Sequence, residues 1–284
     1  MSEPDFSLAQ TRVAIVGLGL MGGSLALDLR GKCAAVYGVD PDPDTQMLAR
    51  TRGIVAKISG DLADILPEAD LVILAAPVRV IVKLVQSLPD AHPGTAVIMD
   101  IGSTKTDIVA AMAALPPRFD PIGGHPMCGR EVSSLVNAYT GMYRGAPFAL
   151  TPLPRTTTRA QALAAQVVAA VGANLLWLDA ATHDQWVAAT SHLPYLVAAA
   201  LAGATPLDAA PLVGPGFLST TRLAGSSRQM MLDILATNRA EVLSALARFE
   251  HNLAALRQSL DAADWDALLA LLAQGAEQRQ EIVG

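Results

Sequence analysis

The chain has 284 residues, enough for one large or two ordinary domains, and 52% of them are hydrophobic against 16% charged, which is typical of a well-buried enzyme. The net charge of −6 argues against nucleic acids and anionic membranes as partners. Two cysteines do not make a disulfide framework, so we expect a reducing, cytoplasmic location.

We expect no targeting, membrane or metal-binding segment. The stretch Met1–Ser7 is acidic and polar, unlike a signal peptide. Every apolar run is interrupted by Asp, Arg, Pro or Gly before it reaches the roughly 18–20 residues of a membrane span. The five histidines and two cysteines show no metal-ligand spacing, so we expect no metal site.

The first predicted elements are a strand, a glycine-rich loop, a helix and a second strand. The apolar run 12–16 is typical of a buried parallel strand, 24–30 has helical character, and the second strand, 36–40, ends in an acid. Glycines in G-x-G-x-x-G register allow a tight turn, close approach of a pyrophosphate and helix–strand contact. This order predicts a Rossmann-type dinucleotide-binding unit. The glycines in register are Gly17, Gly19 and Gly22.

We expect Asp40 to determine the preference for NAD or NADP. Its carboxylate would accept hydrogen bonds from the ribose hydroxyls and repel a 2′-phosphate, and no basic cluster follows it, so NAD is favoured over NADP. The alternative is a turn-forming acid before Pro41. The expected cofactor-binding residues are Gly17, Gly19, Leu20, Met21, Gly22, Asp40, Ala76, Pro77 and Ser103.

The alternation of strands and helices continues. We predict strands over 69–77 and 96–100 and helices over 78–88 and 106–115. In an open α/β sheet, ligands collect outside the carboxyl ends of the strands. The segments at these ends, including 123–129, should therefore converge on one crevice.

His125 lies within this last segment, between a glycine pair and a proline. Gly123 and Gly124 permit backbone conformations closed to other residues, and Pro126 pushes His125 out of the helical region. We therefore expect His125 on a rigid loop, displayed rather than packed. The alternative is a turn that happens to contain a histidine.

Beyond His125 the alternation returns once more. We expect strands over 147–151 and 175–178, with a helix over 158–171 between them. The strand character of 175–178 argues against a domain boundary at 152–154, which is the alternative position.

We predict two domains: a Rossmann domain over 1–180 and an all-helical domain over 181–284. A long helix starting near Asn238 carries a narrow apolar stripe with 3-4-3-4 spacing. Core packing is the default explanation, but a helical domain that cannot close its own core often dimerises, so we expect a homodimer through this domain. The stripe consists of Leu246, Phe249, Leu253, Leu256 and Leu260.

Oxidation by bound NAD requires a base that takes the proton of an alcohol. His125 is the candidate, because the ordinary pKa of histidine is near neutrality. Ser103, at a neighbouring strand end, is expected to hydrogen-bond the other ring nitrogen and set its tautomer. Lys105 is expected to hold substrate or cofactor charge, with a surface lysine as the alternative.

The helical region adds further candidates. Arg222 follows a glycine- and hydroxyl-rich segment and suits a bidentate carboxylate clamp. His192 is as compatible with a satisfied core histidine as with a ligand. His183, before Asp184 at a helix start, is expected to be a capping or interface residue.

Together these stretches resemble the prephenate/arogenate dehydrogenase family of tyrosine biosynthesis. The matching pieces follow the family's order and span nearly the whole chain. They are G-L-G-L-M-G-G-S (17–24), D-I-G-S-T-K (100–105), G-G-H-P-M-C-G (123–129), H-D (183–184), S-H-L-P (191–194) and G-F-L-S-T-T-R (216–222).

The resemblance implies specific roles. His125 matches the catalytic histidine that hydrogen-bonds the ring hydroxyl, and Ser103 matches the serine that supports it. Lys105 matches a lysine near the reacting groups, and Arg222 an arginine that grips a substrate carboxylate. The implied reaction passes hydride to the nicotinamide and releases CO₂, giving 4-hydroxyphenylpyruvate from prephenate or tyrosine from arogenate.

Two departures from the family pattern touch the implied substrate pocket. Many members carry a histidine where this chain has Tyr195, and some carry an arginine at the place of Leu218. His183 and His192 match recurrent histidines of less certain role. Arg222, His192 and Tyr195 are therefore the candidate substrate-binding residues, and the choice between the two substrates stays open.

Two alternatives remain. A β-hydroxyacid dehydrogenase shares the Rossmann-plus-helical plan, but its usual catalytic residue is a lysine of the second domain, and 183–284 contains no lysine. A non-catalytic NAD-binding regulatory protein would not need Ser103, His125 and Arg222 at ligand positions.

Overall fold

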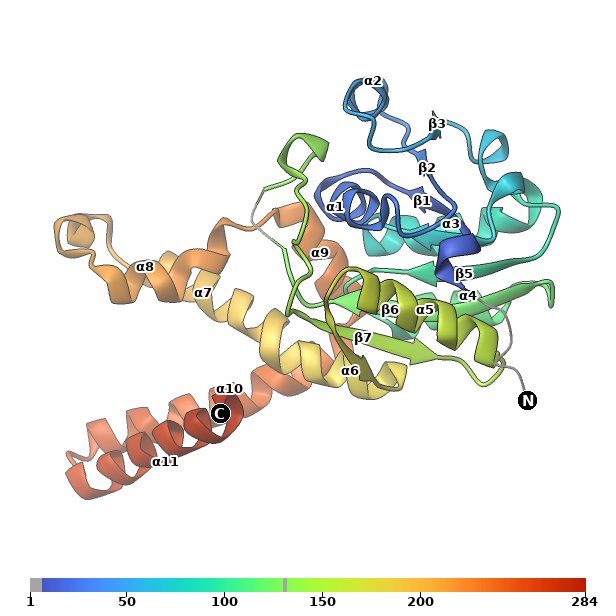
Figure 1. Ribbon diagram of the computed structural model, residues 1–284. Coiled ribbons are helices and arrows are strands. Elements are labelled where there is room, and N and C mark those ends of the chain that lie inside the picture. Colours follow the sequence, from blue (N-terminus) through green and yellow to red (C-terminus); the bar gives the residue numbers. More distant parts are fainter. Residues whose placement is uncertain (1–6, 130–131) are drawn as a thin grey trace. The chain divides into compact units, whose positions relative to one another are not determined.

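The computed structural model describes residues 7–129 and 132–284 (Figure 1). Met1–Phe6 lie outside the described residues. They make up most of the stretch from which we predicted that the chain has no signal peptide. The chain divides into two compact units, Met1–Asn238 and Arg239–Gly284.

An eight-stranded sheet forms the frame of the first unit, in the order β3-β2-β1-β4-β5-β6-β7-β8. The strands from β3 to β6 are parallel and follow the strand order of dinucleotide-binding folds, whereas β7 pairs antiparallel with β6 and parallel with β8. The strands are β1 (Arg12–Val16), β2 (Ala35–Val39), β3 (Lys57–Ser59), β4 (Leu71–Leu74), β5 (Ala96–Asp100), β6 (Phe119–Pro126), β7 (Pro147–Pro152) and β8 (Asn174–Trp177).

Helices cover both faces of the sheet, because alternate residues of each central strand point to opposite faces. In β1, Val13 and Ile15 pack with the helices over 20–29 and 158–170, whereas Ala14 and Val16 pack with the helices over 78–91, 106–113 and 228–237. The α-helices of this unit are α1 (Leu20–Leu29), α2 (Pro43–Thr51), α3 (Val78–Ala91), α4 (Thr106–Ala113), α5 (Thr158–Ala170), α6 (Ala180–Val187), α7 (Leu193–Ala204), α8 (Pro215–Thr221) and α9 (Arg228–Thr237). Shorter helical turns are η1 (Leu8–Gln10), η2 (Leu62–Asp64), η3 (Leu66–Glu68), η4 (Leu135–Asn137), the π-helical η5 (Ala188–His192), η6 (Leu207–Leu212) and η7 (Arg222–Gly225).

The Rossmann architecture and the helical C-terminal region agree with the prediction from the sequence. Helix α1 begins at Leu20 rather than at Ser24, since Gly22 and Gly23 lie in its first turns instead of in the loop. The reason is contact: a methyl group at Gly22 would lie 1.9 Å from the Gly17 carbonyl oxygen. Glycine here serves close packing of the helix against the loop.

The expectation of an exposed His125 loop is wrong. His125 lies in β6, pairs with Ala149 of β7, and is only 8% exposed. A methyl group at Gly123 would lie 2.0 Å from Thr151 Oγ1, and one at Gly124 would lie 2.6 Å from the Asp100 carbonyl oxygen. The glycine pair therefore lets neighbouring strands approach, rather than providing a turn.

One helical run, Ala180–Ala204, is long and apolar enough to cross a membrane by length and composition alone. It contains α6, η5 and α7, and it is interrupted by Asp184 and Pro194, as the sequence indicates. Its polar residues His183, Asp184 and His192 are each at most 2% exposed, so they face the interior of the protein.

The second unit consists of α10 (Arg239–Asp261) and α11 (Trp265–Val283), which pack against each other. The predicted start of the long helix near Asn238 is confirmed. Within the expected stripe, Leu253 and Leu260 are each 54% exposed, and α11 has no buried residue. The two helices leave much of their apolar surface uncovered within this chain.

Candidate active site

The glycine loop after β1 is built for a close ligand. Gly17 has a φ of +96°, and a methyl group on it would lie 2.4 Å from the Ala75 carbonyl oxygen at the end of β4. Gly19 has no heavy atom within 4 Å of the place where a methyl group would stand. It is the N-cap of α1 and supplies no capping side chain, so N–H groups of the first turn stay available. This open helix start fits a pyrophosphate.

Asp40 follows β2 beside this loop. Its Oδ2 accepts a hydrogen bond from the Leu18 N–H at 2.8 Å, and its Oδ1 accepts one from the Asp42 N–H at 3.0 Å. The half-buried carboxylate therefore fixes the glycine loop. Because each carboxylate oxygen has more than one acceptor position, it can also receive a ribose hydroxyl.

The other expected cofactor residues lie at the same end of the sheet as the glycine loop. Ala75 donates its N–H to Val16 at 2.7 Å, which brings Ala76 and Pro77 to the glycine loop. A methyl group at Gly129 would lie 3.9 Å from the Met21 sulfur, so the segment after β6 also lies against the start of α1.

His125 is paired with a second histidine. Its Nδ1 lies 2.8 Å from the Nε2 of His183 on α6, and the two rings meet edge to face with centroids 5.0 Å apart. The other ring nitrogen of His183, Nδ1, lies 2.8 Å from Asp184 Oδ1. A continuous chain of hydrogen bonds therefore runs from a carboxylate on α6 to the candidate base on β6.

Asp184 also holds the start of α4. Its Oδ1 accepts the Lys105 N–H at 2.7 Å, and its Oδ2 accepts the Thr106 N–H at 2.8 Å. Burial opposes ionisation of Asp184, but the hydrogen bonds from His183, Thr106 and Lys105 outweigh it, and its pKa is lowered. The residue is therefore a charged carboxylate in a buried position.

The electrostatics around His125 keep it neutral. Burial lowers the pKa of its imidazole well below the usual value, and the nearby His183, Lys105 and His192 lower it further. A neutral imidazole at physiological pH can accept a proton, which is the property that a general base requires.

His192 is a buried neighbour rather than an exposed ligand. It is 1% exposed, and its Nδ1 lies 3.2 Å from the Asn238 amide, which also donates to the Asp184 carbonyl oxygen at 2.7 Å. Burial lowers the pKa of His192 to about 4. The observed environment is that of a satisfied core histidine.

The position of Lys105 corrects the expectation that it holds substrate or cofactor charge. The side chain is 0% exposed, and its ammonium pairs with Asp100 and donates to the Gly124 carbonyl oxygen at 2.6 Å. Burial lowers its pKa, and the charge of Asp100 opposes that effect. The Lys105 ammonium thus links β5 to β6 in the protein interior, and no part of the side chain reaches the surface.

Ser103 lies half-buried just after β5, on the expected edge of the sheet. Within the described residues, no hydrogen bond joins its hydroxyl to His125. The His125 ring nitrogen that has a hydrogen-bond partner is Nδ1, and that partner is His183 instead of Ser103.

The remaining substrate candidates lie on the helices. Arg222 is exposed at the start of η7, which packs on α7, and Tyr195 of α7 is half-buried against the core.

Sequence reasoning missed the link between His183, Asp184 and His125. The signal was present as a histidine followed directly by an acid at a helix start, but its interpretation as a cap or interface residue separated it from β6. Asp184 does contact a helix start, although it is that of α4 rather than that of its own helix.

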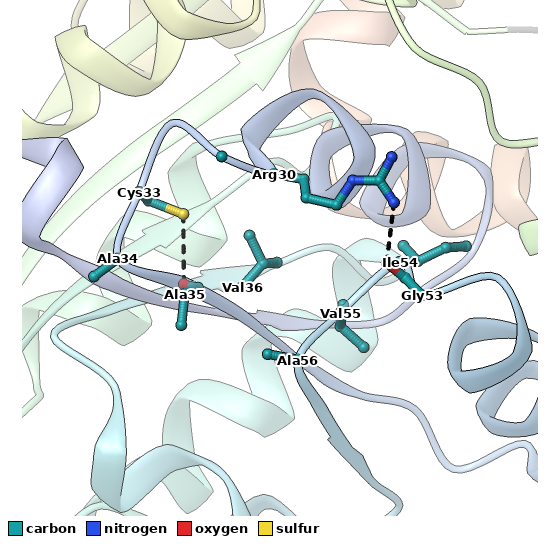
Figure 2. A pocket seen from close by; sticks show the side chains of 10 residues that line it. Arg30, Cys33, Ala34, Ala35, Val36, Gly53, Ile54, Val55 and Ala56 are labelled. Atoms are coloured by element: carbon teal, nitrogen blue, oxygen red, sulfur yellow. Dashed lines mark hydrogen bonds between the residues drawn. The ribbon is translucent and has the colours of Figure 1, made fainter.

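One cavity of about 310 Å³ lies away from this site (Figure 2). It borders the amino-terminal end of β2, the end of the sheet opposite the crevice. Arg30 donates to the Gly53 carbonyl oxygen there at 3.0 Å, and the Cys33 thiol lies 3.4 Å from the Ala35 carbonyl oxygen. Burial raises the pKa of Cys33, so its thiol is not activated as a nucleophile.

Comparison with known proteins gives two family matches that follow each other along the chain. Residues 25–177 match the nucleotide-binding domain of prephenate dehydrogenase, and residues 179–274 match the dimerization domain of prephenate dehydrogenase.

Three individual relatives illustrate the similarity to known proteins. The cyclohexadienyl dehydrogenase of Zymomonas mobilis is 29% identical over 90% of this chain and 91% of its own. A crystal structure of prephenate dehydrogenase from A. aeolicus, in complex with hydroxyphenyl propionate and NAD+, has a TM-score of 0.89 and 32% identity, covering 97% of this chain and 99% of that one. The Synechocystis arogenate dehydrogenase has a TM-score of 0.83 and 30% identity, covering 95% and 99%.

Proposed function

This chain belongs to the prephenate dehydrogenase family, and we propose that His125 is the base of its reaction. The protein is an NAD-dependent dehydrogenase that oxidises and decarboxylates a cyclohexadienol, prephenate, arogenate or both. The observation that supports this role is the buried, neutral imidazole of His125 at the carboxyl end of β6, with its Nδ1 hydrogen-bonded to His183.

The residues of the chain divide the work of the reaction. Bound NAD supplies the hydride acceptor for the ring carbon that bears the hydroxyl group. His125 takes the hydroxyl proton as that carbon becomes a carbonyl. Loss of the ring carboxylate as CO₂ then leaves a phenolate, and His125 returns the proton to its oxygen. The base is thereby regenerated, and aromatisation drives the sequence.

The glycine loop and Asp40 position the cofactor in this proposal. The N–H groups at the open start of α1 would hold the pyrophosphate, and Asp40 would accept the ribose hydroxyls, which favours NAD over NADP. Ser103, near both segments, is assigned to the substrate hydroxyl or the cofactor, because His183 occupies Nδ1 of His125.

Arg222, at the start of η7, is the proposed clamp for a substrate carboxylate. Tyr195 of α7 and His192 of η5 are the other candidate substrate-binding residues, and both are less exposed than Arg222. The support is its place in the family's sequence pattern and its exposed guanidinium side chain. Relatives named for prephenate, arogenate and cyclohexadienyl substrates are 29–32% identical to this chain. The proposal therefore includes both prephenate and arogenate as substrates.

A homodimer through the helical region, 181–284, is part of the proposal. We also propose the domain boundary at 180/181, which is supported by family matches that end at residue 177 and begin at residue 179. Large apolar side chains of α10 and α11 that are more than half exposed provide the surface, namely Leu253, Leu260, Trp265, Leu269, Leu272, Ile282 and Val283. A monomeric mass by light scattering at micromolar concentration would contradict the dimer.

A cytoplasmic location is also proposed. Both cysteines are free thiols, which suits a reducing compartment. The β-hydroxyacid dehydrogenase and the non-catalytic NAD-binding protein are not favoured, because both domains of the chain match prephenate dehydrogenase.

The test is NAD reduction by the wild type with prephenate and with arogenate, compared with His125→Asn. We expect turnover with at least one substrate and a loss of roughly 10²–10⁴-fold in kcat for the variant, the usual contribution of a positioned base. The matched control is His251→Asn, an exposed position on α10. An unchanged kcat in folded His125→Asn would remove His125 from the mechanism.

A further inference from the structure

The hydrogen-bond chain from Asp184 through His183 to His125 has a direction. We propose that His183 and Asp184 are positioning residues that hold His125 in the Nδ1–H tautomer, with Nε2 unprotonated and available to the substrate hydroxyl. This inference rests on the proposed function of His125 and assigns the orienting role to α6, not to Ser103.

The direction of these hydrogen bonds follows from the Asp184 carboxylate, which accepts the last of them. An ionised carboxylate only accepts hydrogen bonds, so the atom of His183 that lies 2.8 Å from Asp184 Oδ1 must carry a proton. That atom is Nδ1. In a neutral imidazole the other nitrogen is then an acceptor, so His183 Nε2 receives a hydrogen bond.

The same reasoning fixes the tautomer of His125. Its Nδ1 lies 2.8 Å from His183 Nε2, an acceptor, and must therefore donate. Neutral His125 carries a single ring proton, and that proton is on Nδ1. The lone pair of Nε2 stays free, which is the state that a base needs at the moment of reaction.

The surroundings of Asp184 support its charged state. Its two oxygens accept N–H groups from Lys105 at 2.7 Å and Thr106 at 2.8 Å, in addition to His183. Both backbone N–H groups lie at the start of α4, where a negative charge is favoured. The residue is 2% exposed, so solvent does not compete for these bonds.

The other ionisable groups near the hydrogen bonds that join Asp184, His183 and His125 come from three parts of the fold. Lys105, before α4, has its ammonium paired with Asp100 of β5, and His192 of η5 is neutral with its Nδ1 beside Asn238. His183, Lys105 and His192 all disfavour a positive charge on His125. Asp184, whose pKa is lowered, is the carboxylate that is joined to His125 by hydrogen bonds through His183.

Proton balance is straightforward in this arrangement. The substrate O–H bond breaks and an N–H bond forms at Nε2 of His125. The hydride passes to NAD from the ring carbon that bears this hydroxyl group. The imidazolium then donates a charge-assisted hydrogen bond from Nδ1 to His183, which is anchored to the carboxylate. After CO₂ leaves, the Nε2 proton passes to the phenolate oxygen, and the starting tautomer is restored.

The tautomer is measurable directly. Wild-type protein labelled with ¹⁵N-histidine and saturated with NAD should show, for His125, a protonated Nδ1 and an unprotonated Nε2 at pH 7.5. The signal is assigned by its absence in His125→Asn. A protonated Nε2 in the wild type would overturn the proposal, even where His125→Asn is inactive and the proposed function stands.

Kinetics of Asp184→Asn provide the second readout. An amide at this position presents an NH₂ group either to His183 or to a backbone N–H, so it cannot keep all three bonds. We expect kcat to fall about 10²–10⁴-fold, with the KM for substrate and for NAD changed less than about threefold. Wild-type kcat in a variant that retains its thermal transition would overturn the proposal.

His183 offers a test that does not depend on how Asp184→Asn folds. In His183→Gln the amide oxygen can still accept the Nδ1–H of His125, whereas His183→Leu offers no acceptor. We expect His183→Gln to retain at least tenfold more kcat than His183→Leu, with equal NAD affinity. Equal kcat values in the two variants would show that His183 only fills space, and would overturn the proposal.

Discussion

The glycine loop and the histidine network lie at the same edge of the sheet but use opposite physical means. At the loop the backbone is the proposed functional group: Gly19 leaves free space, and the start of α1 has no side-chain cap on its N–H groups. In the network, buried side chains are the functional groups, and each depends on the next through a hydrogen bond. A buried polar chain is costly when it is incomplete, whereas a backbone site tolerates changes that keep it open.

This comparison orders the expected effects. Changes that leave a buried charge or donor unpaired should cost more than changes at the rim of the glycine loop. The predictions below run from the network to the loop.

The largest effect is expected for Lys105→Met. The change leaves the Asp100 carboxylate buried and unpaired, since both side chains are 0% exposed. Removing one partner of a buried ion pair costs about 3–5 kcal/mol, so the denaturant midpoint should fall sharply. Lys83→Met on the exposed side of α3 is the control, with a change within about 0.5 kcal/mol. Equal midpoints for the two variants would mean that the Lys105–Asp100 pair is not structural.

The next effect is acid sensitivity from His192. Its pKa is about 4 in the folded protein against an ordinary value of 6.5, so between these pH values the unfolded chain binds more protons. The free energy of unfolding should therefore fall as pH drops from 6.5 to 4, by up to about 3 kcal/mol from this residue. His192→Gln should reduce that slope in urea titrations at several pH values, whereas His251→Gln should not. An unaltered slope would contradict the buried, neutral state of His192.

A smaller effect is expected for Gly22→Ala at the loop. The new methyl group would lie 1.9 Å from the Gly17 carbonyl oxygen, so the start of α1 must shift. Overpacking of this kind costs about 1–3 kcal/mol, and the Kd for NAD measured by calorimetry should rise roughly 5- to 150-fold. Gly203→Ala on α7, where a methyl group meets no atom within 4 Å, is the control. Unchanged NAD affinity in Gly22→Ala would argue against a cofactor at this loop.

The smallest effect is expected for Asp40→Ser. Loss of a ribose acceptor and of repulsion toward a 2′-phosphate should raise the ratio of kcat/KM for NADP over NAD about tenfold, which corresponds to about 1.4 kcal/mol. Asp44→Ser, exposed on α2, should leave the ratio unchanged. A wild type that already prefers NADP would refute this interpretation of Asp40.

The two regions also differ in how far the sequence predicts them. The strand, glycine loop, helix and Asp40 are neighbours in sequence, so their local pattern predicts both the fold and the expected cofactor. The network joins His125 to His183 across 58 residues and Lys105 to Asp184 across 79, and no local period connects them.

The glycine pair before His125 shows a second limit. Glycine is used both for turns and for close approach of strands, and the sequence pattern does not separate these uses. The pairing of β6 with β7 identifies the strand, and Thr151 and the Asp100 carbonyl oxygen leave no room for a methyl group on Gly123 or Gly124. The sequence also could not show that the Lys105 ammonium points into the protein interior, toward Asp100, because a side-chain direction depends on contacts that form only in the fold.

The most direct test of the central claim is the pH dependence of kcat in the wild type and in His125→Asn. Protonated His125 cannot act as a base, and its pKa lies below the usual value, so wild-type kcat should be level near pH 7 and fall only on the acid side of pH 6.5. The slow residual rate of His125→Asn should lack this acid limb. The same acid limb in both proteins would show that another group is the base.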